Sequence, residues 1–206
     1  MGIGLIILTL FFCLARSETY CPYVDTYGED RRTHTDKLTI MQYNVEWAFL
    51  DYNANADCPG NGCVWANETQ SVDHMDHVSN IIRKFNPDII NFCEIQGCDE
   101  LNYLRDHTTN NYNSYMIQGT DTATGQNVGM LTKLDPLTDL ERSEEHYEYP
   151  INGSTCDYNG TGSTGVSKHF VTAFQWKDLK VAYISLHLIA YPTQSDRCAK
   201  REGQAK

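Results

Sequence analysis

The fold of this chain is decided by the stretch PDIINFCE, residues 87–94, together with the upstream stretch TIMQYN, residues 39–44. Each is an apolar, strand-like run that ends in a side chain with an oxygen ligand, Glu94 in one and Asn44 in the other. Hard cations such as Mg²⁺ take one or two carboxylates together with waters and substrate phosphates. Two buried strands that deliver Asn44 and Glu94 to the same end of a sheet would therefore build half of a Mg²⁺ site.

A third apolar run, VAYISL over residues 181–186, ends at His187. A histidine can transfer protons or contact phosphate near neutral pH. The three strand ends together point to phosphoester chemistry.

The spacing of apolar residues predicts a strand over residues 38–45, a helix over 72–85 with Ser71 as its N-cap, and a strand over 89–94. Strand, helix and strand in this order form a βαβ unit, which favours a parallel or mixed sheet with helices outside. We expect the remaining elements to be a helix over 99–107, strands over 112–118 and 128–132, and a hairpin of 169–175 with 181–186. Residues 135–168 are expected to be mostly irregular. The fold class is therefore α/β, of the α+β type.

Composition sets broad limits on function. The chain has 206 residues, 41% of them hydrophobic and 21% charged, which suits one globular domain with a real core. Its formal net charge of -11 excludes a protein that grips nucleic acid through a broad basic face. It does not exclude a nuclease, because a bound metal and a few local cations neutralise a single phosphate.

The N-terminus carries a targeting signal. Residues 3–14 are almost continuously apolar, too short for a comfortable bilayer span, and are followed by Ala15 and then polar chain. This pattern is typical of a secretory signal peptide over residues 1–17, with an uncleaved anchor as the weaker alternative. We expect a protein that is secreted or in the endomembrane lumen, with no stable membrane association after cleavage.

Cysteine usage and sequons agree with that location. Seven cysteines follow the signal peptide, an odd number, and disulfides are expected in an oxidising compartment. Cys58 and Cys63 flank a turn-rich loop that would close a small ring, and the pairing of the others is open. Asn67, Asn152 and Asn159 each begin an N-glycosylation sequon and are taken as glycosylated surface positions.

Four motifs occur in order along the chain: YNV at residues 43–45, PDII at 87–90 leading to Glu94, GQNVG at 125–129, and SLH at 185–187. In this order and spacing, residues 38–205 resemble the endonuclease/exonuclease/phosphatase superfamily, whose fold is deoxyribonuclease I-like. The resemblance implies the first half of a two-sheet, four-layer sandwich with helices packed outside a mixed sheet.

The resemblance also implies roles for individual residues. Glu94 would be the principal ligand of Mg²⁺, or of another hard cation such as Mn²⁺ or Ca²⁺, with Asn44 beside it as a metal or phosphate ligand. His187 would lie against the scissile phosphate as the catalytic group. Gln126 and Asn127 would face the substrate groove.

The chain departs from the family pattern in its second half. The Gly-Asp-x-Asn and Ser-Asp-His segments that complete the family's site are both missing, and the nearest string, Ser195-Asp196-Arg197, carries arginine where histidine is expected. We therefore expect residues 18–206 to be an incomplete domain that lacks its general base and is inactive alone.

Three functions stay open. The first is a secreted metal-dependent phosphoester hydrolase, most simply a nuclease or phosphodiesterase acting on nucleic acid. The second is a lipid or small-molecule phosphatase of the same fold. The third is a non-catalytic secreted glycoprotein that keeps half of the fold. The sequence leaves the oligomeric state open.

One competing metal site needs weighing. His74 and His77 stand three residues apart beside Asp73 and Asp76. Such spacing is common on solvated helix faces, so we interpret this pair as surface. Zinc is a poor interpretation of the cysteines, because no paired C-x₂-C knuckles occur.

Overall fold

The computed structural model describes residues 21, 27–50, 65, 67–109, 111–121 and 124–206. The expected signal peptide, and the loop with Cys58 and Cys63, lie outside these residues. Within them, no helix is long and apolar enough to cross a membrane.

The centre of the molecule is a mixed four-stranded sheet in the order β1-β2-β4-β3. Its strands are β1 (Ile40–Ala48), β2 (Ile89–Ile95), β4 (Asn127–Thr132) and β3 (Asn113–Tyr115). β1 and β2 run parallel, as the predicted βαβ unit requires, while β4 is antiparallel to both β2 and β3. β3 is shorter than the predicted strand over 112–118, because only Asn113 to Tyr115 find partners on β4.

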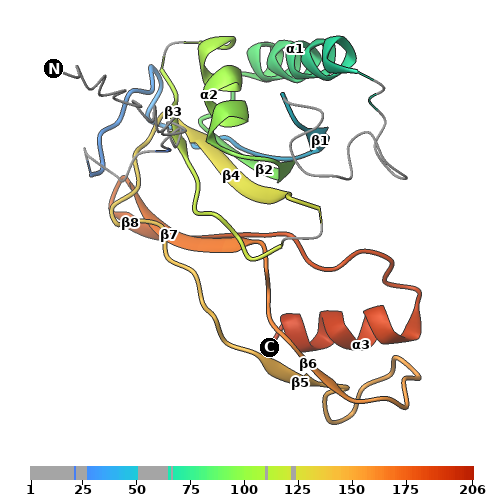
Figure 1. Ribbon diagram of the computed structural model, residues 1–206. Coiled ribbons are helices and arrows are strands. Elements are labelled where there is room, and N and C mark those ends of the chain that lie inside the picture. The colour runs from blue at the N-terminus through green and yellow to red at the C-terminus, as the bar shows by residue number, and fades with distance from the viewer. Residues whose placement is uncertain (1–20, 22–26, 51–64, 66, 110, 122–123) are drawn as a thin grey trace, which may run out of the picture.

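Two helices, α1 (Glu68–Phe85) and α2 (Cys98–Asp106), cover one face of this sheet (Figure 1). α1 begins four residues earlier than predicted: Asn67 is its N-cap and accepts a hydrogen bond from the Gln70 amide at 3.0 Å. The expectation that Ser71 caps the helix is wrong, because its hydroxyl is buried and donates instead to the Phe49 carbonyl.

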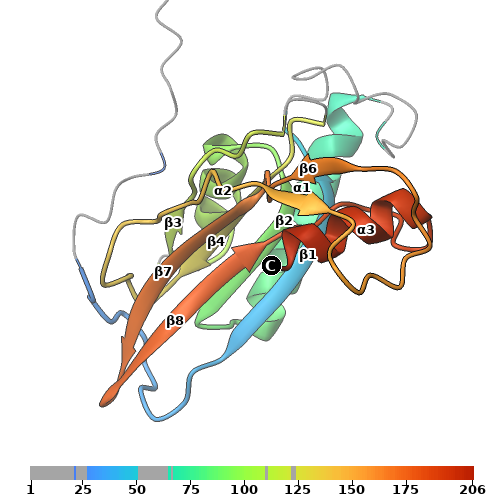
Figure 2. The ribbon, with the colours of Figure 1, turned by 90° about the horizontal axis from the view of Figure 1, so that it is seen from below.

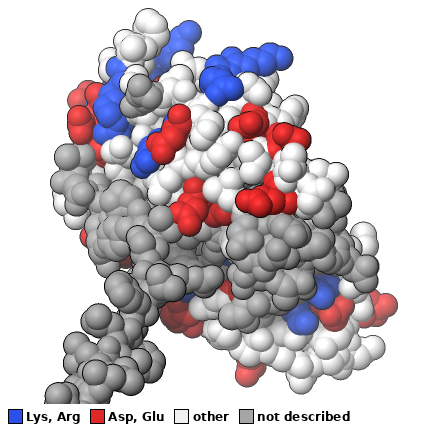
Figure 3. Space-filling view, turned by 45° about the horizontal axis from the view of Figure 1, so that its top comes forward, with Lys and Arg blue, Asp and Glu red and all other residues white. Residues whose placement is uncertain are grey.

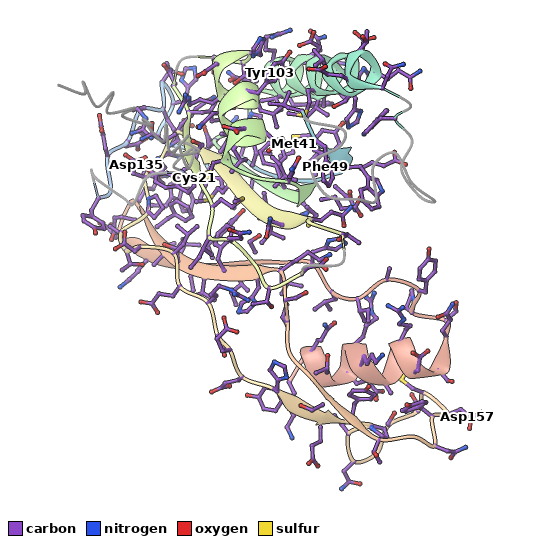
Figure 4. All side chains as sticks on the ribbon, in the orientation of Figure 1. Cys21, Met41, Phe49, Tyr103, Asp135 and Asp157 are labelled. Carbon is purple, nitrogen blue, oxygen red and sulfur yellow. A yellow bond between two sulfur atoms is a disulfide. The ribbon has the colours of Figure 1, made fainter. Side chains whose placement is uncertain are left out.

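The hairpin of β7 (His169–Trp176) and β8 (Leu179–Leu186) covers the other face, as predicted. Phe170, Phe174 and Tyr183 of this hairpin pack against the central sheet, while the helices pack on the opposite side (Figure 2). Side chains fill the space on both sides of the sheet (Figure 4). The described part is thus a three-layer stack of helices, mixed sheet and second sheet, consistent with the expected α/β sandwich.

A smaller lobe lies to one side of these layers (Figure 1). It contains the short strands β5 (Tyr147–Tyr149) and β6 (Gly162–Thr164) and the helix α3 (Ser195–Gln204). The disulfide between Cys156 and Cys198 ties the loop between these strands to α3. The expectation that residues 135–168 are mostly irregular therefore missed a hairpin, because three-residue strands carry too little alternation to be recognised.

The second sheet leaves one edge and one face open. Among the described residues, β8 pairs only with β7. The outer face of the hairpin carries Val171, Ile184 and Leu186, which are 40%, 62% and 44% exposed. An apolar edge strand of this kind is a site where another strand can add.

Candidate active site

Three of the residues singled out in the sequence meet at one end of the central sheet. The Asn44 Nδ2 atom donates a hydrogen bond to Glu94 Oε1 at 2.8 Å. The His187 Nε2 atom lies 3.7 Å from the same carboxylate oxygen. The strand ends of β1, β2 and β8 therefore converge as the sequence predicted, while the chemical roles of the three side chains stay predictions.

A β-bulge places Glu94 in this group. The pairing of β2 with β1 and with β4 skips Glu94 on both sides, passing from Cys93 to Ile95. Regular alternation would turn Glu94 toward α1 and α2; the extra residue instead puts it on the face of Asn44. In this position Glu94 has a left-handed backbone conformation, φ 66°, which costs about 1–3 kcal/mol in a residue other than glycine.

The amide of Asn44 is oriented at both ends. Its Oδ1 atom accepts a hydrogen bond from the Glu46 backbone amide at 3.0 Å, and its Nδ2 atom points at Glu94. The turn that allows this has left-handed backbone at Glu46 and Trp47, with φ of 47° and 58°. β1 thus bulges after Asn44, next to the bulge of β2 at Glu94. Together the two bulges bring the Asn44 and Glu94 side chains into contact.

His187 is held in a partly buried position. Its backbone amide donates to the Lys168 carbonyl at 2.9 Å, and its ring atom Nδ1 is buried with no hydrogen-bond partner among the described residues. Burial lowers the pKa of His187, and the positive charge of Lys168 lowers it further, while Glu94 acts in the opposite direction.

Lys168 belongs to the same site, although the sequence reading did not single it out. Its ammonium group forms an ion pair with Asp121 at 2.6 Å, and both side chains are largely buried, 12% and 14% exposed. Thr124 Oγ1 also donates to Asp121 at 2.6 Å. The predicted hairpin could have indicated Lys168, because a register that pairs His169 with Leu186 places Lys168 directly beside His187.

Gln126 and Asn127 lie at the start of β4 and are both buried. Asn127 accepts a hydrogen bond from the Gly119 amide at 2.8 Å and donates to the Gln96 carbonyl at 2.7 Å. Gln126 accepts one from Thr124 at 3.3 Å. Here these amides contact Gly119 and Thr124 on either side of Asp121, and contact with a substrate stays a prediction for both.

Glycine is required where this loop meets the Lys168 segment. A Cβ atom on Gly119 would lie 2.3 Å from the Ser167 carbonyl oxygen. The Thr120 amide donates to the same oxygen at 3.0 Å. The close approach holds the segment that carries Asp121 against the segment that leads through Lys168 into β7.

The donor set fits a hard divalent cation. Glu94 supplies a carboxylate and Asn44 an amide, both partly accessible, and such cations complete their shells with water and substrate oxygens. The part of the chain that the structure describes holds no group of three or more histidine, cysteine or acidic side chains arranged for a metal. The interpretation of His74 and His77 as a pair without a metal stays a prediction.

The interpretation of both those histidines as surface needs a correction. His77 is exposed, but His74 is half-buried and stacks on Trp65 with ring centroids 4.1 Å apart. A ring nitrogen of His74 also hydrogen-bonds the Val45 carbonyl at 2.5 Å, and burial lowers its pKa. His74 thus supports the end of β1 from the helix side.

The cysteines and sequons can be placed in part. Cys21 pairs with Cys98 and Cys156 pairs with Cys198, whereas Cys93 is buried and unpaired. The sequon residues Asn67, Asn152 and Asn159 are all exposed, and their glycosylation stays a prediction. On the face shown in Figure 3, basic side chains are scattered among acidic ones and form no continuous basic surface.

Comparisons with known proteins bear on the fold. No protein-family model matches the sequence, and no curated protein matches it. Among solved structures, the chain is similar to a beta hairpin deletion mutant of beta toxin from Staphylococcus aureus, with 13% identity over 83% of this chain and 59% of that chain, at a TM-score of 0.50. It also matches ANGEL2, a 2',3'-cyclic phosphatase, with 15% identity over 81% of this chain and 45% of that chain, at a TM-score of 0.46. A further match is an endonuclease/exonuclease/phosphatase family protein from Leptotrichia buccalis, with 13% identity over 76% of this chain and 56% of that chain, at a TM-score of 0.40.

At this level of identity, the match with beta toxin shows a shared fold and nothing finer. The chain has the deoxyribonuclease I-like α/β fold that the order of its motifs predicted. It spans about half the length of the three solved chains.

Proposed function

We propose that this chain carries the metal- and phosphate-binding part of a secreted, divalent-metal-dependent phosphoester hydrolase, a nuclease or phosphodiesterase. The observation that carries the proposal is the convergence of Asn44, Glu94 and His187 from three strands. The Glu94 carboxylate takes a hydrogen bond from Asn44 at 2.8 Å and has the His187 ring 3.7 Å away. A strained backbone at Glu94 supports a functional role, because such strain clusters at functional sites.

Glu94 and Asn44 would hold the cation, Mg²⁺ or alternatively Mn²⁺ or Ca²⁺. A bound cation of this kind stabilises charge on the oxygens of a phosphoester. Glu94 supplies the negative charge that holds it. Asn44 fixes the orientation of that carboxylate through its Nδ2 atom, and its Oδ1 atom, which accepts from the Glu46 amide here, would become a neutral oxygen ligand when the side-chain amide turns over.

His187 and Lys168 form the phosphate side of the proposed site. Lys168 supplies the positive charge, and its ion pair with Asp121 keeps the ammonium group beside His187. Its role would be to neutralise the phosphate during binding. His187 would stabilise developing charge or protonate the leaving group from the position that Lys168 helps to fix.

Asn44, Glu94, Lys168 and His187 are not proposed to activate the attacking water. The chain has neither the Gly-Asp-x-Asn nor the Ser-Asp-His segment that its family resemblance associates with this step. The open edge of β8 and the apolar outer face of its hairpin support a domain that further polypeptide completes. The 206 residues alone are therefore expected to bind metal and phosphate but to turn substrate over poorly.

The substrate is proposed to be a nucleic acid or a comparable phosphodiester. The acidic chain disfavours broad electrostatic binding, so recognition would depend on the cation, Lys168 and His187 acting on a single phosphate.

Calorimetric titration of the oxidised protein with Mg²⁺, and then with inorganic phosphate in the presence of Mg²⁺, tests the proposal. Glu94→Gln is expected to lower Mg²⁺ affinity. His187→Ala and Lys168→Met are expected to lower phosphate affinity while Mg²⁺ affinity stays close to that of the unmodified protein. His77→Ala, on an exposed helix position, is the matched control.

Two results would overturn the proposal. One is Mg²⁺ binding that is unaffected by Glu94→Gln. The other is phosphate binding that survives both His187→Ala and Lys168→Met. Hydrolysis of a model phosphodiester is measured in the same samples; robust turnover by the unmodified chain would show that the water-activating residues lie within it after all.

A further inference from the structure

The loop between β8 and α3 is held in place by side chains of α3. In the described residues, the Ile189 amide donates to Gln204 Oε1 at 3.0 Å, and Arg201 donates to the Ile189 carbonyl at 3.1 Å. Ile189 follows His187 by two residues. Both backbone groups of Ile189 are thus satisfied by one helix, which fixes the course of the chain as it leaves the site.

The same glutamine reaches a second segment. Gln204 Nε2 donates to the Gly165 carbonyl at 3.0 Å, three residues before Lys168. Its single amide therefore uses its acceptor on the His187 segment and its donor on the Lys168 segment. The Lys168 carbonyl in turn accepts the His187 amide at 2.9 Å, so the two segments and Gln204 form a closed set of contacts.

The lobe anchors α3 independently of the central sheet. Figure 1 shows α3 beside β5 and β6, away from β1 and β2. The Cys156–Cys198 disulfide fixes its middle, and a Cβ atom on Gly203 would lie 2.8 Å from Thr164 Cγ2, which shows how tightly it packs on β6. An anchored helix of this kind can hold two loops in register.

We infer that Gln204, assisted by Arg201, is a positioning residue that sets His187 and Lys168 against the same phosphate. The inference rests on the proposed function, since it concerns how that site takes a phosphoester. Gln204 lies on α3, outside the group of side chains that would touch the substrate. It would act only through the backbone of the two segments, as outer partners of ligating groups do.

Substitutions at Gln204 separate its two links. Gln204→Met removes both links and is expected to lower the affinity for inorganic phosphate, in the presence of Mg²⁺, by about tenfold while leaving Mg²⁺ affinity unchanged. Gln204→Glu has nearly the same shape and keeps an acceptor for Ile189, but it presents an oxygen to the Gly165 carbonyl. In this variant, the phosphate-induced NMR shift of the Lys168 side chain should fall, and that of the His187 ring should persist.

Arg197→Gln is the matched control on the same helix, because within the described part of the chain the Arg197 side chain forms an ion pair with Asp196, at 3.8 Å, and no hydrogen bond to either segment. Phosphate affinity in a folded Gln204→Met variant equal to that of the control would overturn the inference. Equal loss of both NMR responses in Gln204→Glu would also overturn it, since that result indicates general loosening and no separate links. An unmodified protein that does not respond to phosphate would instead overturn the proposed function, and this inference with it.

Discussion

The two ends of the β1–β2 pair are built in different ways. At the start of the strands, Asp88 Oδ2 accepts hydrogen bonds from both the backbone amide and the hydroxyl of Thr39, each at 2.8 Å. Lys133, 6% exposed, donates to Asn86 Oδ1 at 2.7 Å and to the Asn86 carbonyl at 3.2 Å, where it caps the end of α1. At this end these four residues satisfy one another's polar groups, although Asn86 also has left-handed backbone, φ 44°, and the nearby Thr109 hydroxyl is buried without a partner among the described residues.

A cavity of about 290 Å³ lies at this same end, bordered by Thr39, Asp88 and Lys133 among other residues. It lies at the opposite end of β1 and β2 from Glu94. Two of its charged lining groups, Asp88 and Lys133, hydrogen-bond to neighbouring residues of the protein.

The other end carries strain and unmet polar groups. Glu94, Glu46 and Trp47 have left-handed backbone, and the Nδ1 atom of His187 is buried without a partner among the described residues. Proteins tolerate such features where function needs them and compensate for them elsewhere. We infer from this difference that the end with Thr39 and Asp88 stabilises the fold, whereas the end with Asn44 and Glu94 is less stable and binds ligands.

The largest expected effect that tests this difference comes from Glu94→Gln. An amide keeps the shape of the side chain but removes its charge, so we expect Mg²⁺ affinity to fall by at least about 100-fold, because even the outer partners of metal ligands contribute about 10- to 100-fold. The free energy of unfolding should change by less than about 0.5 kcal/mol. Calorimetry and urea unfolding measure the two quantities. A large loss of stability with intact metal binding would contradict the division.

Asp88→Ala should show the reverse pattern. It removes the acceptor of the Thr39 amide and hydroxyl, and we expect the free energy of unfolding to fall by about 0.5–1.5 kcal/mol, because Thr39 is exposed and water replaces part of the lost bonding. Mg²⁺ affinity should not change, because Asp88 lies at the far end of the strand. Asp106→Ala is the control, since this carboxylate is exposed and pairs only with the neighbouring Arg105. If Asp88→Ala weakened Mg²⁺ binding as strongly as Glu94→Gln does, the two ends would not be separate.

Glu94→Gly asks whether the site end is strained. Glycine adopts a positive φ without steric cost, so we expect the free energy of unfolding to rise by about 1 kcal/mol while Mg²⁺ binding is lost. Urea unfolding of this variant beside Glu94→Gln isolates the backbone contribution, because both lack the carboxylate. A Glu94→Gly variant no more stable than Glu94→Gln would mean that the bulge stores no strain.

The smallest effects should come from the histidines of α1. His77→Ala should leave stability within about 0.5 kcal/mol, because His77 is exposed. His74→Ala should cost about 1 kcal/mol, through loss of its hydrogen bond to Val45 and its stacking on Trp65. Neither should alter Mg²⁺ affinity. Loss of Mg²⁺ binding in either variant would instead support a metal site on α1 at His74 and His77.

Much of the fold was readable from the sequence. The βαβ unit, the pairing of β7 with β8 and the layered α/β architecture all follow from apolar runs of the right length and period. The errors lie where short-range signals compete. Ser71 looked like an N-cap, but Asn67 took that place and Ser71 was drawn to the Phe49 carbonyl across the core.

For the site, the sequence by itself singled out Asn44, Glu94 and His187, because each follows a strand-like run. In the structure β1 continues past Asn44 to Ala48, and the residues before Asn44 are exposed or half-buried, whereas the run before Glu94 is buried as expected. Only the tertiary structure decided that they meet. Strict alternation would have turned Glu94 toward the helices, and a bulge defined by the neighbouring strands reverses it. The partnership of Lys168 with Asp121, and the reach of Gln204 from α3, were also decided there. Such contacts join segments far apart in the chain, and the strand, loop and helix patterns that fix each segment say nothing of the distance between them.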